Sequence, residues 1–259
     1  MKSEFDGEKY KRASAQQRIW GKKLISELRL KGSERILDLG CGDGLLTAEL
    51  ARLVPDGLAL GIDSCESMMR TARKDHAAPN LRFELQDINT IDFESQFDLI
   101  YSNATLHWVN DHDRLLEHVF KSLKPNGSLR FQFAGEGNCS KLIEVVRKVM
   151  SAEAYAGCFN GFDWPWYMPS VEDYRRLVAE VPFADSRVWS ENADKFFDSV
   201  ETLTKWIDQP SLVPFLGCIA PQDQRSFRNA VVEQMITETR QPDGTYFETF
   251  RRINVLAGK

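Results

Sequence analysis

The chain has 259 residues, of which 42% are hydrophobic, enough for one large domain with a full apolar core. Its net charge of −5 comes without a block of Lys or Arg, which argues against a nucleic acid and favours a small molecule as partner. Five scattered cysteines without a C-x-x-C pair argue against a disulfide framework and a metal site. The lack of a long apolar run argues against membrane insertion. We therefore expect a cytoplasmic protein.

Helix and strand patterns alternate along the first half of the chain. We predict helices over 16–30, 45–54, 66–75 and 112–124, and strands over 35–40, 58–63, 81–87, 97–103 and 128–134. Helix-breaking triplets at 55–57 and 125–127 separate these elements. Such alternation places strands parallel to one another with crossover helices between them. The predicted fold class is therefore α/β, a doubly wound sheet with helices on both faces.

The regular alternation ends after residue 134. Residues 155–169 are aromatic and contain Gly and Pro, which predicts a loop or lid. Beyond them we predict helices over 171–181, 199–207 and 221–240, a strand over 185–190, and strand-like structure over 245–259 after a turn at 241–244. No repeat or linker interrupts the chain. The interpretation is a single domain over 1–259, with an N-terminal helical segment (1–32), a ligand-binding core (33–135) and helical cap segments (138–182 and 199–240).

The segment ILDLGCGDGLLT, residues 36–47, leads from a strand through a glycine-rich turn into a helix. Ligands of open parallel sheets bind outside the carboxyl ends of the strands, where such a turn lies. The spacing is G-x-G-x-G, and Leu45 takes the third glycine position of a dinucleotide fingerprint. Asp38 would repel a pyrophosphate but suits a cation. We therefore discard a nicotinamide cofactor and expect a zwitterionic or positively charged ligand.

Two more acids follow the next two strands. Asp63 ends the second strand, where a carboxylate can accept two hydrogen bonds from a ribose diol. Asp87 ends the third predicted strand and could accept from an exocyclic amino group of adenine. Each acid alone could be an ordinary strand-end or helix-capping residue. Together with Asp38 they form a pattern that indicates a ligand site.

These motifs resemble a known enzyme family. LDLGCGDG, the acid after the second strand, QDI after the third and FDLIYSNATLHWV at the fourth resemble the class I S-adenosylmethionine-dependent methyltransferases over residues 33–135. The resemblance implies S-adenosylmethionine as cofactor and a mostly parallel seven-stranded sheet with a helical cap. Two further segments, YKRASAQQR and NATLHWVNDH, are similar to small-molecule carboxyl methyltransferases of the trans-aconitate, malonyl-carrier-protein and juvenile hormone acid types. LTKWIDQPSLVPFL is similar to a segment of the trans-aconitate type. This similarity implies O-methylation of a small organic acid. We expect no obligate protein partner.

The family resemblance also implies the residues that contact the cofactor. They are Tyr10, Gln17, Arg18, Asp38, Gly40, Gly42, Asp63, Cys65, Met68, Asp87, Ile88, Asn103 and Ala104. Those in the glycine turn would line the methionine part, those after the second and third strands the ribose and adenine, and those after the fourth strand the sulfonium. The guanidinium on the N-terminal helix could meet the methionine carboxylate or an acidic substrate.

The candidate catalytic residues are His107 and Trp108. A carboxylate acceptor is ionised at neutral pH and needs no base, whereas a hydroxyl or amine would use His107 as general base. Both side chains could equally serve packing, as could the aromatic residues of 155–169, which could otherwise wall the acceptor cavity. We expect His112 and His118 at a helix surface, without metal-ligand partners. Carboxylate methylation, hydroxyl or amine methylation, and a non-catalytic cofactor-binding or regulatory module remain the alternatives.

Overall fold

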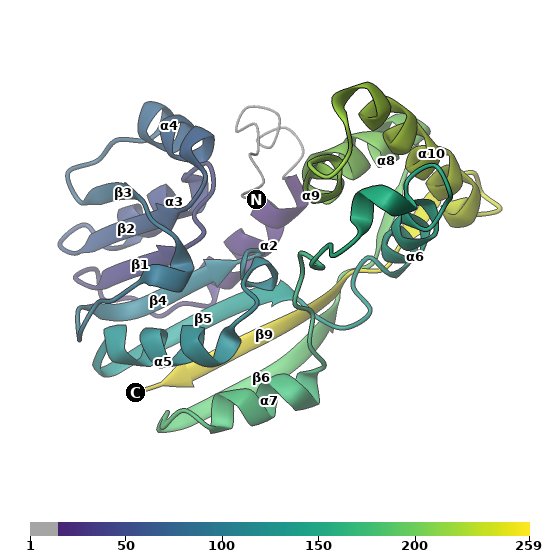
Figure 1. Cartoon of the computed structure of the whole chain (residues 1–259). Coiled ribbons are helices and arrows are strands. Elements are labelled where there is room, and N and C mark those ends of the chain that lie inside the picture. The colour runs from purple at the N-terminus through teal and green to yellow at the C-terminus, as the bar shows by residue number, and fades with distance from the viewer. Residues whose placement is uncertain (1–14) are drawn as a thin grey trace. The chain divides into compact units, whose positions relative to one another are not determined.

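The computed structural model describes residues 15–259 (Figure 1). These residues form two compact units, each described here by itself. The larger unit contains residues 15–136, 166–191 and 252–259, and the smaller unit contains residues 137–165 and 192–251. None of the helices in this described part of the chain is long and apolar enough to cross a lipid bilayer.

A seven-stranded sheet is the centre of the larger unit. Its strands are β1 (Arg35–Leu39), β2 (Leu58–Asp63), β3 (Leu81–Leu85), β4 (Phe97–Asn103), β5 (Leu123–Ala134), β6 (Asp185–Asn192) and β9 (Arg251–Gly258). The strand order is β3-β2-β1-β4-β5-β9-β6. The neighbours from β3 to β5 pair in parallel, and β5 pairs antiparallel with β9. The predicted doubly wound, mostly parallel sheet is confirmed, with its order reversing between β1 and β4.

Helices cover the sheet because its strands bury both faces. The helices of this unit are α2 (Ala15–Ser26), α3 (Leu45–Leu53), α4 (Glu66–Asp75), α5 (His112–Ser122) and α7 (Val171–Ala179), with short turns η1 (Ile88–Thr90) and η2 (Leu106–Trp108). On β1, Ile36 packs in a cluster with Leu24 and Leu50 from α2 and α3. The next residue, Leu37, belongs to a separate cluster that contains Leu116 of α5. Successive strand residues point to opposite faces, so two apolar layers form around one sheet.

Several predicted boundaries were wrong by a few residues. The first helix ends at Ser26 rather than residue 30. Helix α5 ends at Ser122, and β5 begins at Leu123 rather than residue 128 because Leu123 already pairs with Phe97 of β4. Strand β3 ends at Leu85, and Asp87 instead caps η1 by accepting from the backbone N–H of Asn89. These differences arise because pairing and capping, which periodicity does not reveal, decide where an element ends.

The smaller unit is mostly helical. It contains α6 (Ser140–Met150), η3 (Ala156–Phe159), β7 (Lys195–Phe197), α8 (Val200–Trp206), η4 (Ile207–Ser211), α9 (Val213–Leu216), α10 (Pro221–Thr239) and β8 (Tyr246–Glu248). Helix α10 packs against α6, and β7 pairs antiparallel with β8. The aromatic segment predicted as a lid contributes Phe159 and Phe162, whose rings contact Phe227 and Phe215. The predicted cap segment 138–182 is divided, because α7 belongs to the larger unit.

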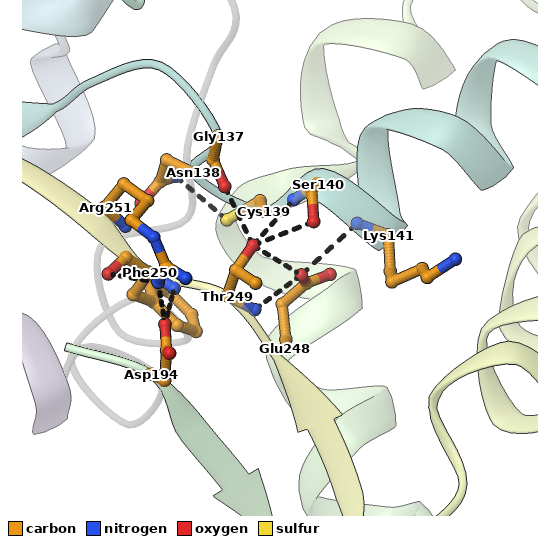
Figure 2. Close-up of polar contacts among 10 residues, drawn as sticks. All are labelled: Gly137, Asn138, Cys139, Ser140, Lys141, Asp194, Glu248, Thr249, Phe250 and Arg251. Carbon is orange, nitrogen blue, oxygen red and sulfur yellow. Dashed lines mark hydrogen bonds and ion pairs between the residues drawn. The ribbon is translucent and has the colours of Figure 1, made fainter. Parts of the chain in front are cut away.

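The N-terminus of α6 is capped by a side chain distant in sequence (Figure 2). Cys139, the N-cap residue, has a left-handed backbone and makes no side-chain cap bond. The carboxylate of Glu248 takes this role, accepting from the backbone N–H of Lys141 at 3.3 Å and of Leu142 at 2.8 Å. It also accepts from the N–H of Thr249 at 2.7 Å, and the Glu248 side chain is fully buried. Burial raises the pKa of Glu248, while these hydrogen bonds oppose that rise.

Replacing Glu248 by Ala should lower the free energy of unfolding by about 2–4 kcal/mol, because it leaves buried amides at the start of α6 without an acceptor. Glu248→Gln should cost less, because its amide keeps one acceptor oxygen. Glu144→Ala is the matched control, since that exposed side chain forms a surface ion pair with Lys141, and it should change stability by less than about 0.5 kcal/mol. Urea unfolding measures all three, and equal effects of Glu248→Ala and Glu144→Ala would contradict the capping role.

Candidate functional site

The turn between β1 and α3 forms one wall of a pocket in the larger unit. Gly40 and Gly42 have φ angles of 72° and 54°, in the left-handed region that favours glycine. A Cβ atom on Gly40 would lie 2.0 Å from Cγ2 of Thr105, so no side chain fits there. The backbone N–H groups of Gly40 and Cys41 both donate to the carbonyl of Ile62 at 2.9 Å. The turn is therefore held against β2, beside the point where the strand order reverses.

Residues from three stretches of the sequence line this pocket. They are Gln17, Arg18, Asp38, Gly40, Cys41, Gly42, Asp43, Leu45, Leu46, Asn103 and Thr105. The first two come from α2, the next seven from β1, the turn and the start of α3, and the last two from the end of β4 and the residues after it. Six of the predicted contact residues are thus brought together at one site.

Asp38 is the most deeply buried charged group of the pocket. It is 2% exposed, and one of its oxygens accepts from the hydroxyl of Thr47 at 2.7 Å. Burial raises the pKa of Asp38 to about 7, the Thr47 hydrogen bond works against this rise, and the nearby charge of Asp63 adds to it. A positive charge on a bound ligand would lower the pKa of Asp38 and so restore its ionised form.

Two amide oxygens add to the acceptors around Asp38. Neither Oε1 of Gln17 nor Oδ1 of Asn103, both buried, has a hydrogen-bond partner among the described residues. The side chain of Asn103 is held against α2, because its Nδ2 donates to the backbone carbonyl of Gln17 at 2.9 Å. Buried acceptors without donors are costly in a protein interior. One carboxylate and two amide oxygens fit the ammonium group of the methionine part of S-adenosylmethionine, the cofactor expected from the sequence.

Asp63 organises the turn from the neighbouring strand. One of its oxygens accepts from the backbone N–H of Gly42 at 3.0 Å, and the other accepts from the N–H of Cys65 at 2.8 Å. Burial raises the pKa of Asp63, and the backbone hydrogen bonds oppose that rise. The carboxylate does not line the pocket, but it ties the glycine turn to the start of α4. Its contact with a ribose remains a prediction.

The predicted adenine contacts lie at the same edge of the sheet but outside the pocket lining. Met68 is buried in α4 and Ile88 is buried in η1. Cys65 precedes α4, and Asp87 precedes η1. Both helical segments follow the carboxyl ends of β2 and β3, which run parallel to β1. The chain therefore brings these residues to the correct edge, while their contacts with a ligand stay predictions.

The segment after β4 carries the predicted catalytic residues. Ala104 has a φ of 56°, unusual for a residue with a side chain, and its N–H donates to the carbonyl of Gln132 at 2.7 Å. In η2, burial lowers the pKa of His107 well below its usual value, and the positive charge of Arg252 lowers it further. Nδ1 of His107 has no hydrogen-bond partner within residues 15–259. His107 is therefore a neutral imidazole at neutral pH.

Aromatic rings surround this turn. The ring of Trp108 lies 5.5 Å from that of His107 and 5.7 Å from that of Trp166, measured between centroids. The backbone N–H of Tyr167 donates to the carbonyl of His107 at 2.9 Å. Neither His107 nor Trp108 lines the glycine-turn pocket. Two residues of the aromatic segment predicted as a lid thus pack on the turn that carries His107.

The predicted surface position of His112 was wrong. His112 is 2% exposed, and its ring contacts those of Phe133, Tyr167 and Tyr174. Nε2 donates to the carbonyl of Leu106 at 3.0 Å, since a carbonyl can only accept, and Nδ1 accepts from the hydroxyl of Tyr174 at 3.0 Å. Burial lowers the pKa of His112 to about 4. The ring therefore holds η2 and α7 together as a neutral packing group.

Sequence reasoning missed some pocket residues and named one that the structure does not describe. Cys41, Asp43, Leu45, Leu46 and Thr105 line the pocket but were not predicted to contact a ligand. Their position in or beside the glycine turn and the NATLHWV segment was the available signal. The predicted contact Tyr10 lies outside the described residues. Within those residues, no group of three or more His, Cys, Asp or Glu side chains is arranged to hold a metal ion.

Known proteins resemble this chain in sequence and fold. Residues 36–127 match the model of a methyltransferase domain family. A trans-aconitate 2-methyltransferase of Deinococcus radiodurans is 32% identical over 228 residues, which cover 86% of each chain. One of Variovorax paradoxus is 28% identical over 264 residues, with 96% of each chain covered. The fold also resembles that of phosphoethanolamine N-methyltransferase 2 of Haemonchus contortus in complex with S-adenosyl-L-methionine, with a TM-score of 0.61 and 16% identity over 98% of this chain and 56% of that one.

Proposed function

Because the chain belongs to the class I S-adenosylmethionine-dependent methyltransferases, we propose that it transfers the methyl group to a carboxylate of a small organic acid. S-adenosylmethionine is its cofactor. The observation that carries the choice of acceptor is the 32% identity to a trans-aconitate 2-methyltransferase over most of both chains. We expect the enzyme to act in the cytoplasm, as its composition predicts, and to need no obligate protein partner.

The pocket residues supply the binding of the cofactor's methionine end. Bound S-adenosylmethionine offers an electrophilic methyl group on a positively charged sulfur. Asp38, Gln17 and Asn103 present acceptor oxygens to the ammonium group of the methionine. The glycine turn lets the protein backbone approach the cofactor closely. Asp63 holds this turn in place from β2. These groups orient the methyl carbon, and alignment is the main way in which an enzyme lowers the barrier of an in-line displacement.

A carboxylate acceptor needs little acid–base help from the protein. With such an acceptor, a carboxylate oxygen would bond to the methyl carbon as the carbon–sulfur bond broke, so opposite charges would cancel and no proton would need to move. The positive charge of Arg252 acts on His107, so the surroundings of η2 favour an anion over a protonated amine. Trp108 and Trp166 lie beside this turn and would exclude water. A water-poor site favours a reaction in which charge disappears.

We expect His107→Gln to reduce kcat by less than about tenfold with a carboxylate acceptor, because no proton must be removed. The measurement is methyl transfer from labelled cofactor to di- and tricarboxylates, including trans-aconitate, followed by fatty and terpenoid acids, between pH 6 and 9. A carboxylate acceptor should give a nearly flat kcat profile in both proteins. Purified enzyme that binds cofactor but methylates no acid in this panel would contradict the carboxylate assignment.

The alternative acceptor is a hydroxyl or an amine, with His107 as general base. The neutral imidazole with an unpartnered Nδ1 favours this alternative. In that case His107→Gln should lower kcat by more than about 100-fold, because proton removal contributes about 10²–10⁴ to such reactions. The size of the loss and the change in pH profile therefore separate the two acceptor classes.

A further inference from the structure

An ion pair joins α2 to the glycine turn across the pocket. Nη2 of Arg18 lies 2.6 Å from Oδ2 of Asp43, and the two side chains are 28% and 12% exposed. The other carboxylate oxygen of Asp43 accepts from the backbone N–H of Leu45 at 3.3 Å. One oxygen of Asp43 therefore accepts from the backbone of its own turn, and the other holds the guanidinium of Arg18. Both residues line the pocket.

The Arg18 guanidinium still has donors to offer. It carries five N–H groups in a planar fork. The contact with Asp43 uses Nη2, while the buried Nε has no acceptor among residues 15–259. A buried donor without an acceptor costs about 1–3 kcal/mol. Such a cost is expected where a ligand brings the missing acceptor, and a carboxylate matches the fork in shape and charge.

We propose that Asp43 is a positioning residue that orients Arg18 to receive the methionine carboxylate of the cofactor. The ammonium group and the carboxylate of the methionine are then bound by different residues. Asp38, Gln17 and Asn103 accept from the ammonium group, and Arg18 donates to the carboxylate. Asp43 itself does not repel the carboxylate, because the guanidinium neutralises it. This inference rests on the binding of S-adenosylmethionine at the glycine turn.

The test compares a ligand that contains the amino-acid carboxylate with one that lacks it. S-adenosylhomocysteine contains the amino-acid carboxylate, whereas 5′-methylthioadenosine has the same nucleoside and a thioether but no amino acid. Affinities from calorimetry are measured for wild type, Arg18→Ala, Asp43→Asn and the double variant. Glu49→Gln is the matched control, because the Lys22–Glu49 ion pair at 2.9 Å joins α2 to α3 and neither of its residues lines the pocket.

Arg18→Ala should weaken S-adenosylhomocysteine binding about 30-fold and Asp43→Asn about tenfold, as expected for a charge-assisted hydrogen bond and its orientation. The double variant should bind like Arg18→Ala, because Asp43 acts through Arg18. Binding of 5′-methylthioadenosine should change less than about threefold in every variant, and Glu49→Gln should bind both ligands like wild type.

Two outcomes would overturn the positioning role. One is unchanged S-adenosylhomocysteine affinity in Asp43→Asn, and the other is an equal loss for both ligands, which would indicate a merely structural effect on the turn. Failure of the wild-type protein to bind S-adenosylhomocysteine would instead overturn the cofactor assignment. The proposal and its premise therefore fail in distinguishable ways.

Discussion

Asp38→Asn is expected to weaken S-adenosylhomocysteine binding by about 100-fold or more and to stabilise the ligand-free protein at pH 8. The loss of affinity follows because Asp38 is the more deeply buried of the two carboxylates that line the pocket, and removing one partner of a buried charge pair costs about 2–5 kcal/mol. Asn keeps an oxygen that can accept from the Thr47 hydroxyl, so the local structure should persist. Calorimetry and thermal unfolding of the same samples measure both effects.

The stability effect has a definite pH dependence. The pKa of Asp38 is about 7 in the folded protein, raised from an ordinary value of 3.8. Between these values the folded state keeps a proton that the unfolded state has lost, so stability falls as pH rises from about 4 to 7. Asn cannot ionise and escapes this loss. Asp38→Asn should therefore match wild type at pH 4 and exceed it at pH 8 by about 1–4 kcal/mol.

The same ionisation should appear in ligand binding. The ammonium group of S-adenosylhomocysteine binds the ionised carboxylate, so the affinity of wild type for this ligand should fall by up to about tenfold per pH unit below pH 7. Binding at pH 6 should release a proton, detected by calorimetry in buffers of different ionisation enthalpy. Asp38→Asn should show neither effect. Proton release that persists in Asp38→Asn would assign the ionisation to another group.

Asp98→Asn is the matched control for Asp38→Asn. Asp98 lies on the adjacent strand β4, outside the pocket, and accepts from Lys124 and from the backbone N–H of Arg35. These hydrogen bonds and charges lower the pKa of Asp98 although partial burial opposes them. The variant should lose stability above about pH 4 and bind ligand normally. The two substitutions thus have opposite expected signs for stability.

Gly40→Ala is expected to abolish cofactor binding. The new Cβ would lie 2.0 Å from Cγ2 and 2.6 Å from Oγ1 of Thr105, in a turn whose φ is +72°. The left-handed backbone alone costs about 1–2 kcal/mol for a residue with a side chain, and the clash forces the turn or the segment after β4 to move. We expect S-adenosylhomocysteine affinity to fall at least about 100-fold, measured by calorimetry on protein shown to be folded by circular dichroism.

Gly244→Ala separates the cost of a left-handed backbone from the cost of the clash with Thr105. Gly244 also has a positive φ, of +88°, but a Cβ there would meet nothing within 4 Å. This variant should show only the cost of the backbone conformation and keep full cofactor affinity. In addition, Gly40→Ala combined with Thr105→Gly should recover part of the lost affinity. If Gly40→Ala binds ligand as wild type does, the close packing of the turn against Thr105 is not required for the site.

Local pattern was sufficient to predict the framework of this protein. The alternating helices and strands predicted the parallel sheet, because each strand buries both faces and each crossover needs a helix. The glycine spacing and Asp38 predicted the turn that lines the pocket, because backbone conformation and charge are properties of a few adjacent residues. Gln17, Arg18 and Asn103, implied by the family resemblance, also line the pocket. Features that depend on a few adjacent residues, such as the conformation of a turn, can therefore be predicted from the sequence.

The tertiary structure decided which distant groups meet. His112 and Tyr174 are 62 positions apart but share a buried hydrogen bond, and Arg18 and Asp43 are 25 positions apart but form an ion pair across the pocket. The fully buried cap of α6 comes from Glu248, more than 100 residues later in the chain. The raised pKa of Asp38 and the neutral His107 likewise follow from burial. Burial and pairing across the sheet depend on how the whole unit packs, and no local pattern of residues contains that information.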